Sequence, residues 1–229
     1  MNINADLSQP AVVNTELLPW IDSPQPGVQR RLLERDGAEV ARATTLVRFQ
    51  PNSFFAEHTH DAGEEFLVLE GVFSDEMGDF PAGMYVRNPI GSRHRPHTRG
   101  GTTILVKLRQ FDPADQEYVR IDTANASWLA GPAAGTSRLP LHEFGGERVV
   151  MLRLEPGSRY QHTYAGGEEI FVVSGSFTDE RGDYATGSWI RNPGDNAHSL
   201  FSEQGCLLFV KTGHLADGEE PVRLDDCGN

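Results

Sequence analysis

The 229-residue sequence is poor in cysteine and carries far fewer basic than acidic residues. Its two cysteines, Cys206 and Cys227, are too few for a disulfide framework and are not spaced as a metal-binding pair. Cys206 lies in the apolar run CLLFV, which predicts a buried structural thiol. The formal net charge of −13 repels a phosphate backbone and argues against nucleic-acid binding.

The sequence also lacks a secretory signal and a membrane-spanning segment. The start, MNINADLSQPAVVN, has no basic region followed by an apolar run, and no stretch approaches the length that crosses a bilayer. We therefore expect a cytoplasmic protein without a membrane partner. Hydrophobic residues make up 38% of the chain, enough for the core of one large domain or of two smaller ones.

An internal repeat organises the chain. HTHDAGEEFLVLEGVFSDEMGDFPAGMYVRNP, which begins at residue 58, recurs as HTYAGGEEIFVVSGSFTDERGDYATGSWIRNP, which begins at residue 162. The offset of 104 residues holds as far as Lys107 and Lys211, and upstream, after small gaps, Trp20 pairs with Trp128. Such a repeat predicts two tandem copies of one domain. We place a flexible leader at 1–13, domain 1 at 14–111, a polar linker at 112–127, domain 2 at 128–217 and a tail at 218–229.

Both copies have the pattern of β structure. Runs such as ATTLVRF and ERVVMLRL are rich in branched residues and are separated by Gly, Pro and Asp. VQRRLLERDG could form a helix, but its counterpart TSRLPLHEFGG contains a proline, so we expect strands in both. Many short strands in a domain of about 100 residues predict a sandwich or a jelly-roll barrel.

The stretch HTHDAGEEF is the first candidate site. His58 and His60 are two residues apart, so in a strand both side chains project to the same face. Glu64 follows after a turn, and His94 comes after a Gly-rich hairpin. Three imidazoles and one carboxylate suit Zn, Fe, Mn, Ni or Cu and leave room for water or substrate. Surface histidines near a turn are the alternative interpretation.

These residues stand at the spacing of the two motifs of the cupin superfamily, which the sequence resembles. The positions that match are His58, His60, Glu64 and Gly71 in the first motif, and Gly83, Pro89, Gly91 and His94 in the second. Asn52 replaces the first glycine of the pattern, and Thr98 replaces its last asparagine. The resemblance implies a jelly-roll fold, the double-stranded β-helix, with His58, His60, Glu64 and His94 as metal ligands.

Two nearby residues compete with this ligand set. Glu65 adjoins Glu64, but strand alternation turns it away if Glu64 points inward. His97 follows His94 closely; it could act as an acid or base, or hydrogen-bond to a ligand, if it faces the cavity. The alternative interpretation, which is equally favoured, is that His97 is an exposed histidine in a loop.

The arginines of the two RNP triplets, Arg87 and Arg191, could orient an anionic ligand. Their presence in both copies favours structural ion pairs instead.

Within the superfamily, the stretches GEEFLVLEGVFSDEMGDFPAG, YVRNP and VKLRQF resemble the ChrR family of cupin domains, named after anti-sigma factors. The resemblance covers nearly the whole chain after the leader and implies a tandem pair, a bicupin. It also implies a bound metal, zinc in the anti-sigma proteins, and a regulatory response to oxidative stress. The anti-sigma proteins bind the sigma factor through a separate N-terminal helical zinc domain. Only a short leader precedes Trp20 here, so we do not expect direct sigma-factor binding.

The second copy departs from the ligand pattern. The equivalent residues are His162, Tyr164, Glu168 and His198, and Asp195 replaces the glycine of the second motif. A phenol, whose reference pKa is about 10, is a poor ligand near neutral pH. Two histidines and a carboxylate can still form a facial triad for iron. We expect a weaker second metal site or none, in which case this copy is a scaffold that packs against the first.

Three functions agree with these patterns. The ChrR resemblance favours a metal-binding sensor or regulatory protein. The resemblance extends to small cupins that cleave carbon–carbon bonds, which implies an Fe(II)-dependent dioxygenase acting on a diketone or a hydroxylated aryl ketone. A non-catalytic binding module with a structural metal is the third.

We expect one divalent metal per chain in domain 1, zinc or iron before manganese or nickel. A small-molecule ligand and a homodimer through β-edges are the expected partners.

The departure at Tyr164 leads to a first prediction. Tyr164→His should raise the metal content per chain above that of the parent, because it restores the third imidazole. Elemental analysis of both proteins measures the difference. An unchanged content would show that the second copy has no preformed metal cavity.

Overall fold

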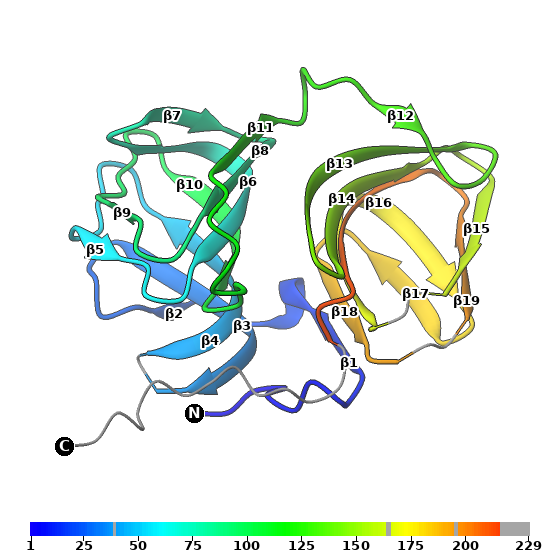
Figure 1. The fold of residues 1–229 in the computed structure, drawn as a ribbon, viewed down its shortest axis with the longest axis horizontal. Helices are drawn as coiled ribbons and strands as arrows, with labels where there is room; N and C mark the ends of the chain where they lie inside the picture. The colour runs from blue at the N-terminus through cyan, green and yellow to red at the C-terminus, as the bar shows by residue number, and fades with distance from the viewer. Residues whose placement is uncertain (39, 164–165, 195–196, 216–229) are drawn as a thin grey trace.

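Two β-barrels stand side by side in the computed structural model, which describes residues 1–38, 40–163, 166–194 and 197–215 (Figure 1). The strands are β1 (Ala11–Asn14), β2 (Ile21–Asp22), β3 (Val28–Gly37), β4 (Ala41–Phe49), β5 (His58–Thr59), β6 (Glu64–Asp75), β7 (Gly78–Pro81), β8 (Met84–Asn88), β9 (Arg93–His94), β10 (Thr102–Leu108), β11 (Val119–Asp122), β12 (Leu129–Ala130), β13 (Thr136–Phe144), β14 (Glu147–Leu154), β15 (Ser158–His162), β16 (Glu168–Asp179), β17 (Gly182–Ala185), β18 (Ser188–Asn192), β19 (His198–Ser202) and β20 (Cys206–Thr212). One 3-10 turn, η1 (Thr15–Leu17), follows β1. Among the described residues, no helix is long and apolar enough to span a bilayer.

The two barrels have the same strand order. The first sheet runs β11-β8-β6-β10-β4-β3-β2, with β7 on β6, and β5 pairs with β9 beside it. The second runs β1-β18-β16-β20-β14-β13-β12, with β15, β17 and β19 completing the barrel. The predicted all-β fold of two jelly-roll domains is confirmed. VQRRLLERDG and TSRLPLHEF are the strands β3 and β13, as expected.

The leading strand of each repeat pairs with the barrel of the other. β1 extends the second barrel, with Ala11 opposite Arg191, and β11 extends the first, with Val119 opposite Arg87. The two strands are equivalent, because Ala11 and Val119 are separated by the same 108 residues as Trp20 and Trp128. The flexible leader predicted at 1–13 is therefore wrong for residues 11–13, which belong to β1, and the linker predicted at 112–127 is wrong for residues 119–122. Both segments supply the outer hydrogen bonds that β18 and β8 would otherwise lack. The predicted tail, 218–229, lies outside the described residues.

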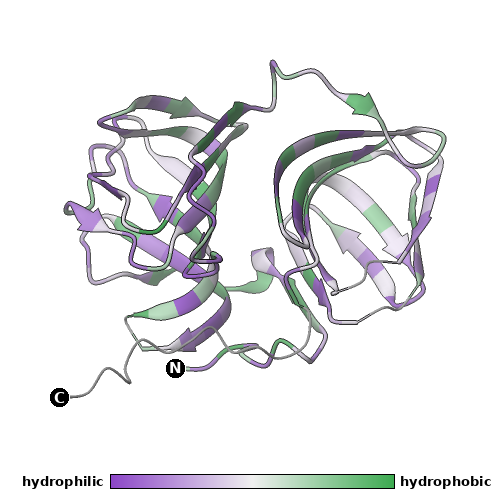
Figure 2. Ribbon diagram, viewed as in Figure 1, coloured by the Kyte–Doolittle hydropathy of each residue, from purple (hydrophilic) through white to green (hydrophobic). Residues whose placement is uncertain are grey.

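Alternation along the strands divides the apolar residues among three clusters, and Figure 2 shows hydrophobic and hydrophilic residues alternating along them. Phe66 and Val68 of β6 point into the first barrel, whereas Leu67 between them points toward the second. Cys206 belongs to the interior of the second barrel, so the predicted buried thiol is confirmed. The interface cluster, which joins the barrels, comprises Ala11, Leu33, Leu46, Leu67, Tyr85, Leu105, Val119, Leu139, Leu141, Val149, Met151, Phe171, Trp189 and Phe209.

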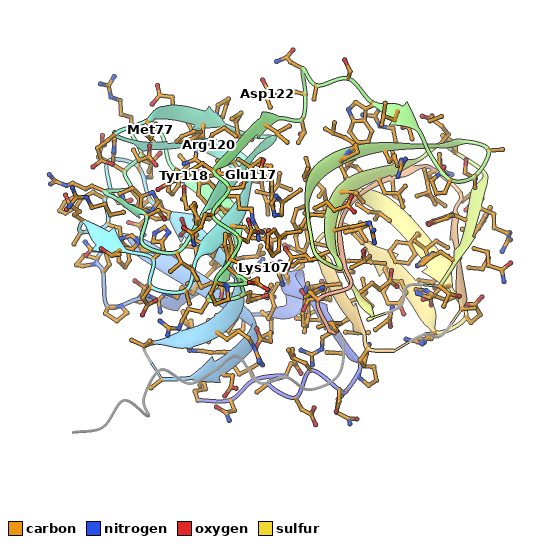
Figure 3. All side chains as sticks on the ribbon, viewed as in Figure 1. Met77, Lys107, Glu117, Tyr118, Arg120 and Asp122 are labelled. Carbon is orange, nitrogen blue, oxygen red and sulfur yellow. The ribbon has the colours of Figure 1, made fainter. Side chains whose placement is uncertain are left out.

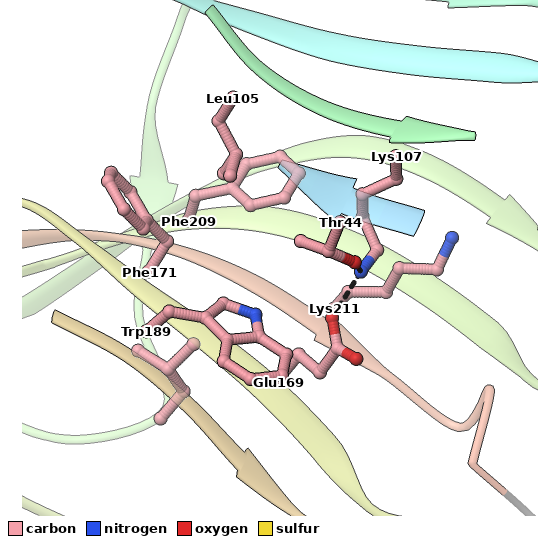
Figure 4. Close-up of a pocket in the computed structure, with 9 residues that line it drawn as sticks. Thr44, Leu105, Lys107, Glu169, Phe171, Trp189, Phe209 and Lys211 are labelled. Carbon is pink, nitrogen blue, oxygen red and sulfur yellow. Dashed lines mark hydrogen bonds and ion pairs between the residues drawn. The ribbon is translucent and has the colours of Figure 1, made fainter. Parts of the chain in front are cut away.

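Two buried ion pairs cross this interface in a reciprocal way. The Lys107 ammonium on β10 contacts Glu169 on β16, and the Lys211 ammonium on β20 lies 2.6 Å from a carboxylate oxygen of Glu65 on β6. Figure 4 shows the first pair beside Thr44, whose hydroxyl accepts a 2.8 Å hydrogen bond from Lys107. Burial alone would raise the pKa of Glu65 and of Glu169, but the lysine charges hold both pKa values far below the ordinary range. Each lysine therefore compensates a carboxylate of the opposite barrel.

The two RNP arginines have different partners. The Arg87 guanidinium lies 2.9 Å from Glu65 and 3.2 Å from Glu147, and it also pairs with Asp115 at 2.5 Å. The structural ion pair predicted for Arg87 is confirmed. Arg191 instead donates hydrogen bonds to backbone carbonyls of the N-terminal segment, those of Asn4, Asp6 and Gln9. The interpretation of Arg191 as an ion-pair residue is wrong, because the segment before β1 lies over this side chain.

Replacing one interface lysine tests this arrangement. Lys107→Met should lower the free energy of unfolding by about 3–5 kcal/mol, because Glu169 is then left buried and uncompensated. Urea denaturation measures the change. The control is Arg148→Met, which removes an exposed pair with Glu143 at 3.0 Å and should cost less than about 1 kcal/mol. Equal losses in the two variants would contradict the interface role of Lys107.

Candidate metal centre

The four predicted ligands of the first repeat come together inside its barrel. His58 on β5 lies opposite His94 on β9 in antiparallel register, His60 follows β5, and Glu64 begins β6. One ligand atom from each residue lies within 4.8 Å of all the others. The imidazole centroids are 4.7–5.0 Å apart. His60, Glu64 and His94 are buried, and His58 is partly exposed.

Local backbone geometry accounts for this convergence. Asn52 adopts φ +61°, the left-handed conformation for which the cupin pattern uses glycine. Asparagine tolerates this region better than most residues, so the departure leaves the turn intact. Downstream, Gly91 at φ +84° donates its N–H to the His60 carbonyl, and His60 donates to the Ser92 carbonyl, each at 2.8 Å. This pair of bonds ties the loop before β9 to the HxH segment.

The spacing of the side chains fits a metal ion. Glu64 Oε2 is 3.5 Å from His60 Nδ1 and 3.6 Å from His94 Nε2, longer than good hydrogen bonds. Both His60 nitrogens and His94 Nε2 are buried without a hydrogen-bond partner among the described residues. A buried, unsatisfied polar atom costs about 1–3 kcal/mol. An ion with ligand distances of about 2.0–2.2 Å would satisfy these atoms together.

Outer hydrogen bonds orient the ligands. His94 Nδ1 lies 3.0 Å from Asp75 Oδ2, and His58 Nδ1 lies 2.9 Å from the Ala56 carbonyl. Asn88 Nδ2 donates to Glu64 Oε2 at 2.9 Å. The Nδ1 contacts of His94 and His58 leave Nε2 of each imidazole to face the centre. These contacts also raise the basicity of the two Nε2 atoms.

For His60 and Glu64, the electrostatics favour the forms that coordinate metals. Burial lowers the pKa of His60, which keeps this imidazole neutral. Burial acts to raise the pKa of Glu64, but His60, His94 and the Asn88 hydrogen bond outweigh it and lower the pKa. For His94, burial acts to lower the pKa, whereas the hydrogen bond to Asp75 and the Glu64 charge raise it above the ordinary value.

The second cluster is closed by its own hydrogen bonds. His162 Nε2 lies 2.9 Å from Glu168 Oε2, His198 Nε2 contacts Glu168 Oε1, and Asn192 donates to the same carboxylate at 3.0 Å. Burial acts to raise the pKa of Glu168, but the bonds from the two histidines lower it to about 2. One ligand atom from each of His162, Glu168 and His198 lies within 4.8 Å of the others, as in the first cluster. Tyr164 and Asp195, at the positions that depart from the pattern, lie outside the described residues.

The competing residues lie away from the first centre. Glu65 points to the interface, as alternation predicts. His97 is exposed, with its Nδ1 3.5 Å from the Arg95 carbonyl, so it does not face the cavity. Thr98, at the asparagine position of the motif, donates its hydroxyl to the Val72 carbonyl at 2.7 Å.

Sequence reasoning missed Asp75 and Asn88. The available signal was their exact repetition as Asp179 and Asn192 at the offset of 104 residues.

The barrel and its His/Glu set define the class of cupin proteins, and comparison with known proteins agrees. The model of the ChrR cupin-like domain family matches residues 8–112 and again 116–216. The chain belongs to this family, with two domains in tandem. A comparison with curated protein sequences finds no match.

Solved structures share the fold at low identity. YlbA from Escherichia coli is 15% identical, with a TM-score of 0.73 and coverage of 96% of each chain. A provisionally named dioxygenase from Nostoc punctiforme PCC 73102 is 16% identical, with a TM-score of 0.74 and coverage of 93% of this chain and 85% of the other. The bacterial pirin YhhW from Escherichia coli, solved with nickel(II), is 13% identical, with a TM-score of 0.66 and coverage of 89% and 98%. These likenesses establish the fold.

The second cluster predicts an acid-sensitive part of the stability. The folded pKa of Glu168, about 2, lies below the ordinary 4.5. Its contribution, on the order of 3 kcal/mol, is complete above pH 4.5 and is lost as the pH falls toward 2. Urea unfolding of the metal-free protein at about pH 6 and about pH 3 measures the decline, which should be smaller in Glu168→Gln. The same decline in both proteins would contradict the assignment to Glu168.

Proposed function

We propose that this bicupin binds one divalent metal ion in its first repeat and acts as a stress- or small-molecule-responsive sensor. The observation that carries the proposal is that both nitrogens of His60 and Nε2 of His94 lie buried near Glu64 with no hydrogen-bond partner in the part of the chain that the structure describes. The donor set of three imidazoles and one carboxylate suits zinc or iron first, and also manganese or nickel. A small-molecule ligand and a second copy of the chain are the proposed partners, and a cytoplasmic location is part of the same proposal.

The number of protein ligands argues against a catalytic zinc site, and this favours a non-enzymatic role such as sensing. Catalytic zinc sites keep one open position beside three protein ligands, whereas structural sites are closed by four. Here His58, His60, Glu64 and His94 supply four. Membership of the ChrR cupin-like family agrees with a regulatory role. Direct sigma-factor binding is not part of the proposal.

An Fe(II)-dependent dioxygenase is the second candidate. An ion that prefers six ligands would retain two open positions beyond the four protein ligands. His58 is only partly buried, so one side of the cluster lies near solvent. When bound, iron would polarise the oxygens of a diketone or of a hydroxylated aryl ketone and bring O2 next to them. The resemblance to a provisionally named dioxygenase is one of fold and adds only that the fold suits this chemistry.

Substitution of a ligand tests the metal centre. His94→Ala or His58→Ala should abolish stoichiometric metal, because each removes one imidazole from the first shell. Metal content is measured by plasma mass spectrometry on untagged protein purified anaerobically without chelators. The matched control is His97→Ala, an exposed histidine three residues from His94, which should retain the parent's metal. Full metal content in His94→Ala would refute the assignment.

The identity of the metal separates the candidates. About one zinc per chain would support the sensor, and about one iron would support the dioxygenase and justify measuring O2 consumption with diketones and phenolic ketones. A parent protein without metal would refute both and leave a non-catalytic binding module.

A further inference from the structure

An arginine from the second repeat reaches the metal cluster of the first. Arg120 lies on β11, the strand that begins the second repeat and pairs with β8 of the first barrel (Figure 3). Its Nη2 donates to Asn88 Oδ1 at 2.6 Å, and its Nη1 donates to the Arg87 carbonyl at 2.8 Å. Asn88 Nδ2 in turn donates to Glu64 Oε2 at 2.9 Å. A continuous chain of hydrogen bonds therefore runs from Arg120 to the carboxylate ligand.

The second repeat makes the same contact from a different place. Arg181, in the turn after β16, donates to Asn192 Oδ1, and Asn192 donates to Glu168. The residue equivalent to Arg181 in the first repeat is Met77. The residue equivalent to Arg120 is Val12 on β1.

The two repeats thus exchange the positions of the arginine. The first has methionine in the turn and arginine on the leading strand, and the second has arginine in the turn and valine on the leading strand. An arginine reaches the asparagine oxygen in both. Because one fold places the guanidinium there by two routes, the contact itself, and not the strand, is the shared feature.

Hydrogen-bond chemistry explains what this contact does. An asparagine amide has an acceptor oxygen and a donor nitrogen of nearly the same shape, so it can rotate by half a turn in its site. Arginine has only donors and must meet the oxygen. With Arg120 on Oδ1, Asn88 presents Nδ2 to Glu64 and holds the carboxylate by a donated bond. Rotation would place the amide oxygen against the carboxylate, where two acceptors repel.

We propose that Arg120 is a positioning residue for the metal centre of the first repeat, acting through the amide of Asn88 on the orientation of Glu64. The inference rests on the proposed metal binding. It makes the centre a property of both repeats, since the second repeat contributes the strand that orients a ligand of the first. The reciprocal exchange of β1 and β11 provides the route.

Affinity measurement on the full chain tests the inference. Arg120→Val, which installs the residue found at the equivalent position on β1, should weaken Zn²⁺ and Co²⁺ binding in competition with a chelator by about 10-fold or more. It should also change the visible absorption of the Co²⁺ form, because the carboxylate ligand is reoriented. Adding Met77→Arg to Arg120→Val, which copies the arrangement of the second repeat, should restore most of the affinity and the parent spectrum. Arg148→Val, at an exposed arginine of β14, is the control and should bind as the parent does.

Each outcome decides a separate point. A parent chain that binds neither ion overturns the proposed metal site and this inference with it. A parent that binds, with equal affinity in Arg120→Val, overturns the positioning role alone, and so does a loss that Met77→Arg fails to restore. If Arg120→Val does not fold, Arg120→Lys replaces it, because lysine keeps the charge but lacks the fork that meets Asn88 and the Arg87 carbonyl together. Parent-like affinity and spectrum in that variant would overturn the proposal.

Discussion

The reciprocal pairing of Lys107 with Glu169 and of Lys211 with Glu65 is the constraint on which the rest of the structure depends. The four charged groups are buried, and each lysine meets a carboxylate of the opposite barrel, so separation of the barrels would break both pairs. The apolar cluster around these pairs adds the nondirectional attraction. The ion pairs also fix how the two barrels are positioned relative to each other, because each lysine has to meet a particular carboxylate.

The same strands carry the interface and the candidate metal centre. On β6, Glu64 points into the barrel and Glu65 points to the interface, since successive side chains alternate. On β8, Arg87 serves the interface, and its neighbour Asn88 serves the centre. A displacement of either strand would therefore alter both sites. The geometry of the candidate centre is thus tied to that of the interface through β6 and β8.

The two repeats show how one scaffold gives different sites. In the first, Glu64 stays beyond hydrogen-bond distance of His60 and His94, and the nitrogens remain available. In the second, Glu168 contacts both of its histidines directly. The spacing along the chain is the same in both copies, so spacing alone does not distinguish the two clusters, although Tyr164 replaces one histidine in the second. The difference lies in how closely the carboxylate approaches the imidazoles.

The sequence by itself determined the tandem architecture, the strand character and the convergence of His58, His60, Glu64 and His94, because these follow from local alternation and from a motif at fixed spacing. Only the tertiary structure decided where residues 11–14 and 119–122 belong and which barrel receives Arg120. Pairing between distant strands depends on which strand edges still lack hydrogen-bond partners once each barrel has formed, and no local sequence pattern predicts this pairing. The outer hydrogen bonds of the candidate centre depend on that pairing.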